Sequence, residues 1–178
     1  VTDTQLNYKV SSGLARPDFF DWPTELAKKL PEVDPDIVVA TFGGNDAQGL
    51  TVPELTAAGQ PDFIIGDPVA NEAEWLAEYQ RRAGEVMDLL LEDDRAVIWV
   101  GIPNDDSADV TARLEVQDRA AKAAAAERPG IVFCNFKDAL QRVSDHLNAS
   151  GIPHASFHGG LEQADRRSEE HTSELQSH

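Results

Sequence analysis

Several residue types are scarce in this chain of 178 residues, and each scarcity excludes something. A single cysteine, Cys134, rules out an intrachain disulfide. Only 15 basic residues stand against 32 acidic ones, and the resulting formal charge of −17 repels nucleic-acid phosphates and anionic lipid. No apolar run approaches the ~18 residues of a membrane-spanning helix, and no signal peptide opens the chain. We therefore predict a protein with no membrane segment and no nucleic-acid partner.

The rest of the composition is that of an ordinary globular protein. Hydrophobic residues make up 41% of the chain and charged residues 26%, and the length suffices for one domain with a core. The chain opens with "VTDTQLNYKV" and not with Met. From this opening we expect a fragment whose original N-terminal part is missing.

Hydrophobic periodicity predicts strands that alternate with helices. Short apolar runs of the kind found in strands buried on both faces occur at residues 36–42, 96–103 and 130–136. Apolar spacings of three and four residues, with capping residues, predict helices at residues 72–92, 107–127 and 137–150. Another helix is expected at residues 19–30, where Pro23 occupies the first turn and Pro31 stops it. Weaker strands are expected at residues 5–10 and 152–160, and loops at residues 49–71.

This alternation predicts an α/β fold with a mostly parallel sheet that is covered by helices on both faces. In such folds, ligands bind outside the carboxyl ends of the strands. The segment "GGND" at residues 43–46 follows one predicted strand, and "IPNDD" at residues 102–106 follows another. Ser12 and Gly13 follow the weak strand at residues 5–10. We expect these three segments to meet at one edge of the sheet.

Four blocks in this order resemble a bacterial cell-envelope family of SGNH hydrolases, the GDSL-like esterases. The blocks are "SSGLARPDFFDWPTEL", "GGNDAQ", "EWLAEYQRRAGEVM" and "VIWVGIP", and the resemblance spans about residues 11–128. It implies a three-layer α/β/α sandwich of flavodoxin-like type. It also implies an ester hydrolase acting on an acyl ester or a cell-envelope carbohydrate ester, without a cofactor, in the periplasm or cell envelope.

The resemblance also implies roles for individual residues. Gly13 and Asn45 fall on the two positions whose N–H groups line the oxyanion hole in this family. Arg16 and Asp18 are expected at the substrate cleft, the alternative for them being a surface salt bridge. Asp46 is placed with these substrate-side residues, although bracing the loop is its expected main role.

Two blocks of the family pattern do not occur in the chain. There is no "GDS" block with its serine nucleophile, so the first central strand of the sheet is also expected to be missing. There is no "DxxH" block either, because none of the five histidines has an aspartate three residues before it. Ser11 and Ser12 have no paired base. The chain as written is therefore expected to be an inactive hydrolase fragment spanning residues 1–129.

The C-terminal third carries a different resemblance. "IVFCNFKDA" and "HGGLEQADR" resemble motifs of the second RecA-like domain of DEAD-box RNA helicases, over about residues 130–166. Residues 167–178, "RSEEHTSELQSH", resemble the translation of a sequencing-library adapter and are expected to be disordered. The alternative functions are accordingly a helicase fragment or a chimeric translation product without a selected function.

The other candidate groups favour structural roles. The loop at residues 104–106 is expected to be a solvated turn that caps a helix rather than a metal site. His154 and His158 lack a third ligand, so no metal site is predicted there. Asp21 is a further candidate for the substrate cleft. Cys134 lies in an apolar strand and is expected to be an inert core thiol.

Overall fold

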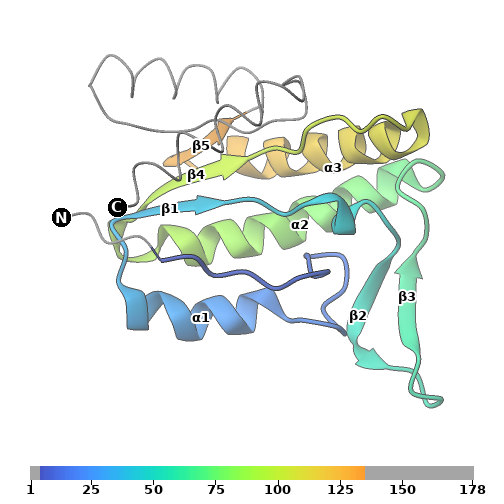
Figure 1. Ribbon diagram of the computed structural model, residues 1–178, viewed down its shortest axis with the longest axis horizontal. Helices are drawn as coiled ribbons and strands as arrows, with labels where there is room; N and C mark the ends of the chain where they lie inside the picture. The colour runs from blue at the N-terminus through green and yellow to red at the C-terminus, as the bar shows by residue number, and fades with distance from the viewer. Residues whose placement is uncertain (1–4, 135–178) are drawn as a thin grey trace, which may run out of the picture. The chain divides into compact units, whose positions relative to one another are not determined.

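The computed structural model describes residues 5–134 (Figure 1). A three-stranded sheet has the order β1-β4-β5, and a separate two-stranded sheet pairs β2 with β3. The strands are β1 (Ile37–Ala40), β2 (Leu50–Leu55), β3 (Pro61–Ile65), β4 (Ala96–Val100) and β5 (Ile131–Cys134). The helices are α1 (Trp22–Val33), α2 (Glu72–Leu91) and α3 (Ala108–Ala126), with short 3-10 turns η1 (Gly44–Asp46) and η2 (Glu92–Asp94).

The predicted fold class is confirmed. The protein is α/β with a mostly parallel sheet, consistent with a flavodoxin-like arrangement. β1 pairs with β4 in parallel, with Ile37 opposite Ala96 and Ala40 opposite Trp99. Among residues 5–134, β1 forms the edge of this sheet, because no described strand pairs with its other side. Residues 5–10, expected to form a weak strand, make no such pairing and are exposed.

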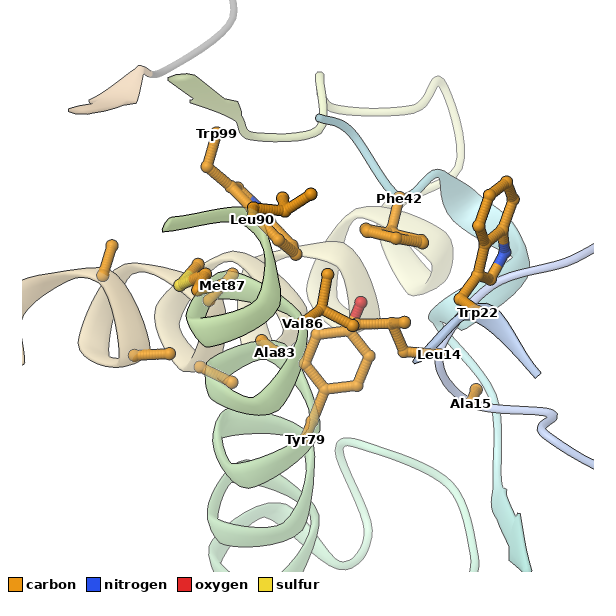
Figure 2. Close-up of a cluster of buried hydrophobic side chains, with 14 of the residues drawn as sticks. Leu14, Ala15, Trp22, Phe42, Tyr79, Ala83, Val86, Met87, Leu90 and Trp99 are labelled. Atoms are coloured by element: carbon orange, nitrogen blue, oxygen red, sulfur yellow. The ribbon is translucent and has the colours of Figure 1, made fainter. Parts of the chain in front are cut away.

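The helices pack on one face of the three-stranded sheet and form one hydrophobic core with it. α2 packs against both α1 and α3, and Figure 2 shows its apolar stripe of Tyr79, Ala83, Val86, Met87 and Leu90 facing the side chains of the other elements. Trp22, Phe42 and Trp99 extend this core as a chain of ring contacts, with centroids 5.6 and 5.2 Å apart. The 20-residue α2 is therefore the central helix of the described unit, as its periodicity predicts.

The opposite face of the sheet is exposed among the described residues. Ile37 and Val39 of β1 are 61% and 65% exposed, and Val132 of β5 is 56% exposed. The prediction that residues 36–42 form a strand buried on both faces is therefore wrong for β1. The alternate residues Val38 and Ala40 do pack against the core. A run of β-branched residues cannot distinguish a strand with one covered face from a strand with two.

Proline placement explains two differences from the predicted elements. α1 continues through Pro31 to Val33, because the missing N–H and the bulk of a proline this close to the end disturb only the last turn. Asp34 N–H closes that turn on the Leu30 carbonyl, and the left-handed conformation of Asp34 (φ 47°) then ends the helix. Residues 49–71, expected to be loops, contain the β2–β3 hairpin. Pro53 and Pro61 fit there because a two-stranded ribbon consists of edge strands only.

The remaining predicted elements agree with the structure to within a few residues. The helix predicted at residues 107–127 is α3, and the Ser107 side chain accepts the hydrogen bond from Val110 N–H that caps it. The described elements lie in the unit Val1–Phe133, with Cys134 ending β5. The helix at residues 137–150, the strand at 152–160, the helicase-like segment beyond Cys134 and the tail at 167–178 lie outside the described residues and stay predictions.

Candidate active site

The candidate site lies where two neighbouring strands end. β1 and β4 run in parallel and in register, so the loops that follow Ala40 and Val100 leave the sheet at the same edge. The "GGND" turn, η1, belongs to the first loop and approaches α3, where the position of a Cβ on Gly44 would be 3.9 Å from Leu114. This is the edge at which parallel sheets bind ligands.

Asp46 ties this turn to the segment at residues 12–16. Its side chain is completely buried. One oxygen accepts hydrogen bonds from Leu14 N–H (2.9 Å) and the Tyr79 hydroxyl (2.6 Å), and the other accepts from Ala15 N–H (2.8 Å). Three donors thus replace the water that the carboxylate loses on burial. The bracing role expected for Asp46 is consistent with this geometry.

Gly13 lies directly against the Asp46 carboxylate. A Cβ at Gly13 would stand 1.9 Å from Asp46 Oδ1 and 2.5 Å from its Cγ, far inside any permitted contact. Only glycine leaves room for the carboxylate to reach the amides of the next two residues. Gly13 therefore packs against the residue that follows Asn45, so the two expected oxyanion positions belong to adjoining segments.

The carbonyl groups of the same segment are held by Arg82 of α2. Its Nη1 donates to the carbonyls of Leu14 (2.9 Å) and Ala15 (3.3 Å), and its Nη2 donates to the Thr51 carbonyl (2.7 Å). Glu78, one turn earlier, accepts from Arg82 Nε at 2.8 Å. Arg82 is only 8% exposed, so its charge also faces the buried carboxylate of Asp46.

Gln117 of α3 holds the turn from the other side. Its Nε2 donates to the carbonyl of Phe42 (2.8 Å), to that of Gly43 (3.4 Å) and to the Tyr79 hydroxyl (3.2 Å). Figure 2 shows the Tyr79 ring leaving α2 on the side of the core where Leu14 and Phe42 lie. Tyr79 therefore donates to Asp46 and accepts from Gln117, which links α2, α3 and both loops.

Burial sets the protonation of the two central groups. Burial raises the pKa of the Asp46 carboxyl, while the hydrogen bonds from Tyr79, Ala15 and Leu14 act in the opposite direction. Burial and the neighbouring Asp46 charge raise the pKa of the Tyr79 hydroxyl well above its ordinary value. Tyr79 consequently keeps its proton at neutral pH and remains a donor.

Asn45 stands outside this buried network. It is exposed, whereas Asp46 and Ala47 after it are buried. Its carbonyl accepts a hydrogen bond from Gln48 Nε2, and its side-chain amide makes no hydrogen bond to a residue within 5–134. A turn that is fixed from within and carries a free amide on its outer side suits donation to a ligand.

Arg16 and Asp18 form a pair beside the hairpin. Arg16 donates from Nε and Nη2 to the two carboxylate oxygens at 2.8 and 2.7 Å, and lies over the Phe63 ring at 5.3 Å. The hydrogen bond from Arg16 is the main reason that the pKa of Asp18 falls to about 2, and the Thr51 hydroxyl also donates to Asp18. The Asp18 side chain is only 3% exposed. Arg16 and Asp18, which the sequence places at the substrate cleft, therefore form a packed ion pair in the structure.

The other candidates have local roles. Asp21 caps α1, accepting from Thr24 N–H at 3.2 Å. Ser11 is exposed and adopts a left-handed backbone (φ 61°), and the buried Ser12 donates to the Lys9 carbonyl and accepts from Trp22 Nε1. In the exposed loop at residues 104–106, Asp105 accepts from Ser107 N–H at 2.8 Å.

Cys134 is half-buried, and the five histidines all lie outside the described residues. No group of three or more His, Cys, Asp or Glu side chains within residues 5–134 could hold a metal ion.

Sequence reasoning missed Tyr79, Arg82 and Gln117. Tyr79 looks like one more member of the apolar stripe of α2, and Arg82 like a solvent-facing charge. Their spacing of three residues, which puts both on one face of the helix, is the only signal in the sequence. Gln117 is an isolated polar residue in an alanine-rich helix and carries no signal of its own.

A family model described as "Protein of unknown function (DUF459)" matches residues 2–159. None of the curated proteins compared with the chain matches it. In the part of the chain between residues 5 and 134, no helix has the length and apolar character needed to cross a bilayer.

Proposed function

The chain belongs to the DUF459 family, and from that premise we propose that residues 12–47 form the oxyanion side of an acyl-ester hydrolase site of the SGNH type. One observation carries the proposal. The Asp46 carboxylate accepts hydrogen bonds from the backbone N–H groups of Leu14 and Ala15. These bonds join the segment that carries Gly13 to the segment that carries Asn45, at the carboxyl end of the sheet.

The chemistry of acyl transfer gives these groups a use. Attack on an ester carbonyl converts its oxygen into an alkoxide, and N–H donors aimed at that oxygen are worth roughly 10²–10³ in rate each. The Gly13 backbone N–H and the Asn45 side-chain amide are the proposed donors. Because buried hydrogen bonds fix the backbone of both segments, the positions from which the two donors project do not change when charge develops.

The same proposal assigns the remaining features by resemblance. The substrate is a small acyl ester or a cell-envelope carbohydrate ester, and Arg16 and Asp18 form one wall of its cleft beside Phe63. No cofactor takes part, and the setting is the periplasm or cell envelope. Residues 1–178 contain neither "GDS" nor "DxxH", so these residues by themselves are expected to bind the site's ligands without turning over an ester.

A helicase or chimeric origin is the alternative for residues 130–178. The motif "HGGLEQADR" favours it. Two observations weigh against it as the function of the chain: the formal charge of −17, and a family match that runs on to residue 159 through most of the helicase-like segment. The adapter-like tail follows the matched residues.

The test is the binding of a tetrahedral anion by the whole chain. We would titrate ¹⁵N-labelled protein with ethyl methylphosphonate, which resembles the intermediate of acetyl-ester hydrolysis. The side-chain amide of Asn45 and the N–H of Gly13 are expected to shift together and to saturate. Asn45→Ala should weaken binding about tenfold, equivalent to ~1.4 kcal/mol.

Asn104→Ala is the matched control, because Asn104 is exposed on the neighbouring loop at the same sheet edge. It should leave binding within about twofold of the unchanged chain, well below the effect expected at Asn45. Absence of saturable shifts, or equal losses in the two variants, would refute the proposed function.

A further inference from the structure

We propose that Gln117 is a positioning residue for this site: it fixes the direction in which the turn of Asn45 faces. The inference rests on the proposed function and extends it to a residue of α3 far along the chain. Gln117 is 2% exposed and reaches the backbone 74 and 75 residues earlier, at Gly43 and Phe42. It does not touch the proposed ligand and acts only through the turn.

The geometry of the peptide bond explains how Gln117 acts. In a trans peptide unit the C=O of one residue and the N–H of the next point in opposite directions. Gln117 Nε2 holds the Phe42 and Gly43 carbonyls, so the peptide units 42–43 and 43–44, which lead into the turn of Asn45, have a fixed orientation. The Gly43 carbonyl also accepts from Asp46 N–H at 3.0 Å, which closes η1. Asn45 therefore projects from a turn whose preceding backbone is held by hydrogen bonds on its core side.

Gln117 also connects this turn to the second proposed donor. Gln117 donates a hydrogen bond to the Tyr79 hydroxyl, and this hydroxyl donates to the Asp46 carboxylate. The same carboxylate accepts hydrogen bonds from the backbone N–H groups of Leu14 and Ala15. One continuous series of hydrogen bonds thus runs from α3 to the residue after Gly13. The relative position of the two donors depends on this series, since the segments that carry them are joined by it.

Packing alone is a poor explanation for a glutamine at this position. Gln117 Oε1 is buried and has no hydrogen-bond partner among the described residues. Leaving a polar atom unpaired in this way is costly, and an apolar side chain of the same length would avoid the cost. The amide supplies what methionine cannot, namely directed donation to two carbonyls.

The experiment compares three variants of the full chain. Gln117→Met keeps the length of the side chain and removes its donors. Gln117→Glu replaces the amide with a carboxyl that donates only when protonated, and burial raises the pKa of such a group. Gln80→Met is the matched control, because Gln80 lies on α2 beside Tyr79 but is directed at the exposed Glu127. Thermal unfolding verifies that each variant is folded.

The first readout needs no ligand. The backbone amide resonances of Gly43 and Gly44, whose N–H groups share peptide units with the Phe42 and Gly43 carbonyls, should move in Gln117→Met and stay in place in Gln80→Met. The second readout is ethyl methylphosphonate binding, which Gln117→Met should weaken about tenfold. In Gln117→Glu, binding should be weak near pH 8 and recover in part as the pH is lowered, because the protonated carboxyl regains one O–H donor where the amide has two N–H donors. Wild type and Gln117→Met are titrated alongside, because Asp46 and Asp118 have raised pKa values and lie near Tyr79.

Each outcome decides something. A folded Gln117→Met whose Gly43 and Gly44 amide resonances are unchanged would overturn the inference, whatever the ligand does. Amide resonances that move, with binding weakened in Gln117→Met and partly recovered in Gln117→Glu at low pH, would support it. Failure of the unchanged chain to bind the phosphonate refutes the proposed function instead, and with it any role for Gln117 beyond shaping the turn.

Discussion

Replacing Gly13 with alanine should be among the most damaging single-methyl changes in the described unit. The added Cβ would stand 1.9 Å from Asp46 Oδ1 and 2.9 Å from Oδ2. Gly13 does not have a positive φ, so the backbone itself accepts alanine and the whole penalty comes from the contact. Asp46 cannot give way cheaply, because it is fully buried and held by three hydrogen bonds.

The size of the effect follows from what the contact breaks. Moving the carboxylate by the ångström or more needed for a normal contact would stretch its bonds from Leu14 and Ala15, now 2.9 and 2.8 Å, out of hydrogen-bonding range. Unsatisfied buried groups cost about 1–3 kcal/mol each, and a buried charge that loses its partners costs about 3–5 kcal/mol. We expect the free energy of unfolding to fall by about 3–5 kcal/mol, a large share of the ~5–15 kcal/mol of a typical domain.

Urea unfolding, followed by the fluorescence of the buried tryptophans, measures this loss. Gly43→Ala is the control, since no atom lies within 4 Å of the position of its Cβ and its φ of −83° is open to any residue. The control should change stability by less than about 1 kcal/mol. In an Asp46→Ala background the penalty for Gly13→Ala should shrink to a similar value, because the clashing atoms are gone. Equal effects of the Gly13 and Gly43 changes in the unmodified background would refute this reasoning.

Three further outcomes follow from the same contacts. Tyr79→Phe should lower the free energy of unfolding by about 1–3 kcal/mol in the same urea assay, because it removes one of the three donors to Asp46. The pKa of Asp18 is lowered to about 2, so the stability that its ionised form contributes is present above pH 3.8 and is lost as the pH falls toward about 2. In an acid titration over that interval, Asp18→Asn should lose less stability than the unchanged chain. The chain of 178 residues should hydrolyse p-nitrophenyl acetate at the buffer rate with or without Asn45→Ala, and turnover that falls tenfold in that variant would contradict this.

The sequence was sufficient to predict most of the regular elements of residues 5–134. The strands β1, β4 and β5 and the helices α2 and α3 are visible as short β-branched runs and as three- and four-residue spacings. The β2–β3 hairpin was missed because Pro53 and Pro61 argue against central strands, and nothing local reveals that both strands are edges. The exposed face of β1 was missed for a similar reason, since burial depends on which elements pack nearby.

For the candidate site, the sequence indicated the turn and the glycine better than the buried side chains that hold them in place. The "GGND" turn at a strand end follows from motif and strand order, whereas Gly13 follows from the family resemblance alone, since residues 5–10 form no strand. Asp46 was expected to brace its own loop, and the partners of its side chain come from two other segments, residues 14–15 and α2. Tyr79 reaches the turn from 33 residues away and Gln117 from 74 and 75 residues away, a relation that exists only after the helices have packed.

The hub around Asp46 has a consequence for how this protein assembles. Its bonds to the earlier loop and to Tyr79 span 31 to 33 residues. The bonds from Arg82 to the Leu14 and Ala15 carbonyls and from Gln117 to the Phe42 and Gly43 carbonyls span 67 to 75. Opening the earlier loop alone would leave the buried Asp46 carboxylate and the Arg82 guanidinium without these partners, which makes local opening costly. The amide hydrogens of Leu14 and Ala15 should therefore exchange with solvent only when the entire unit opens, although they lie in a segment without regular secondary structure.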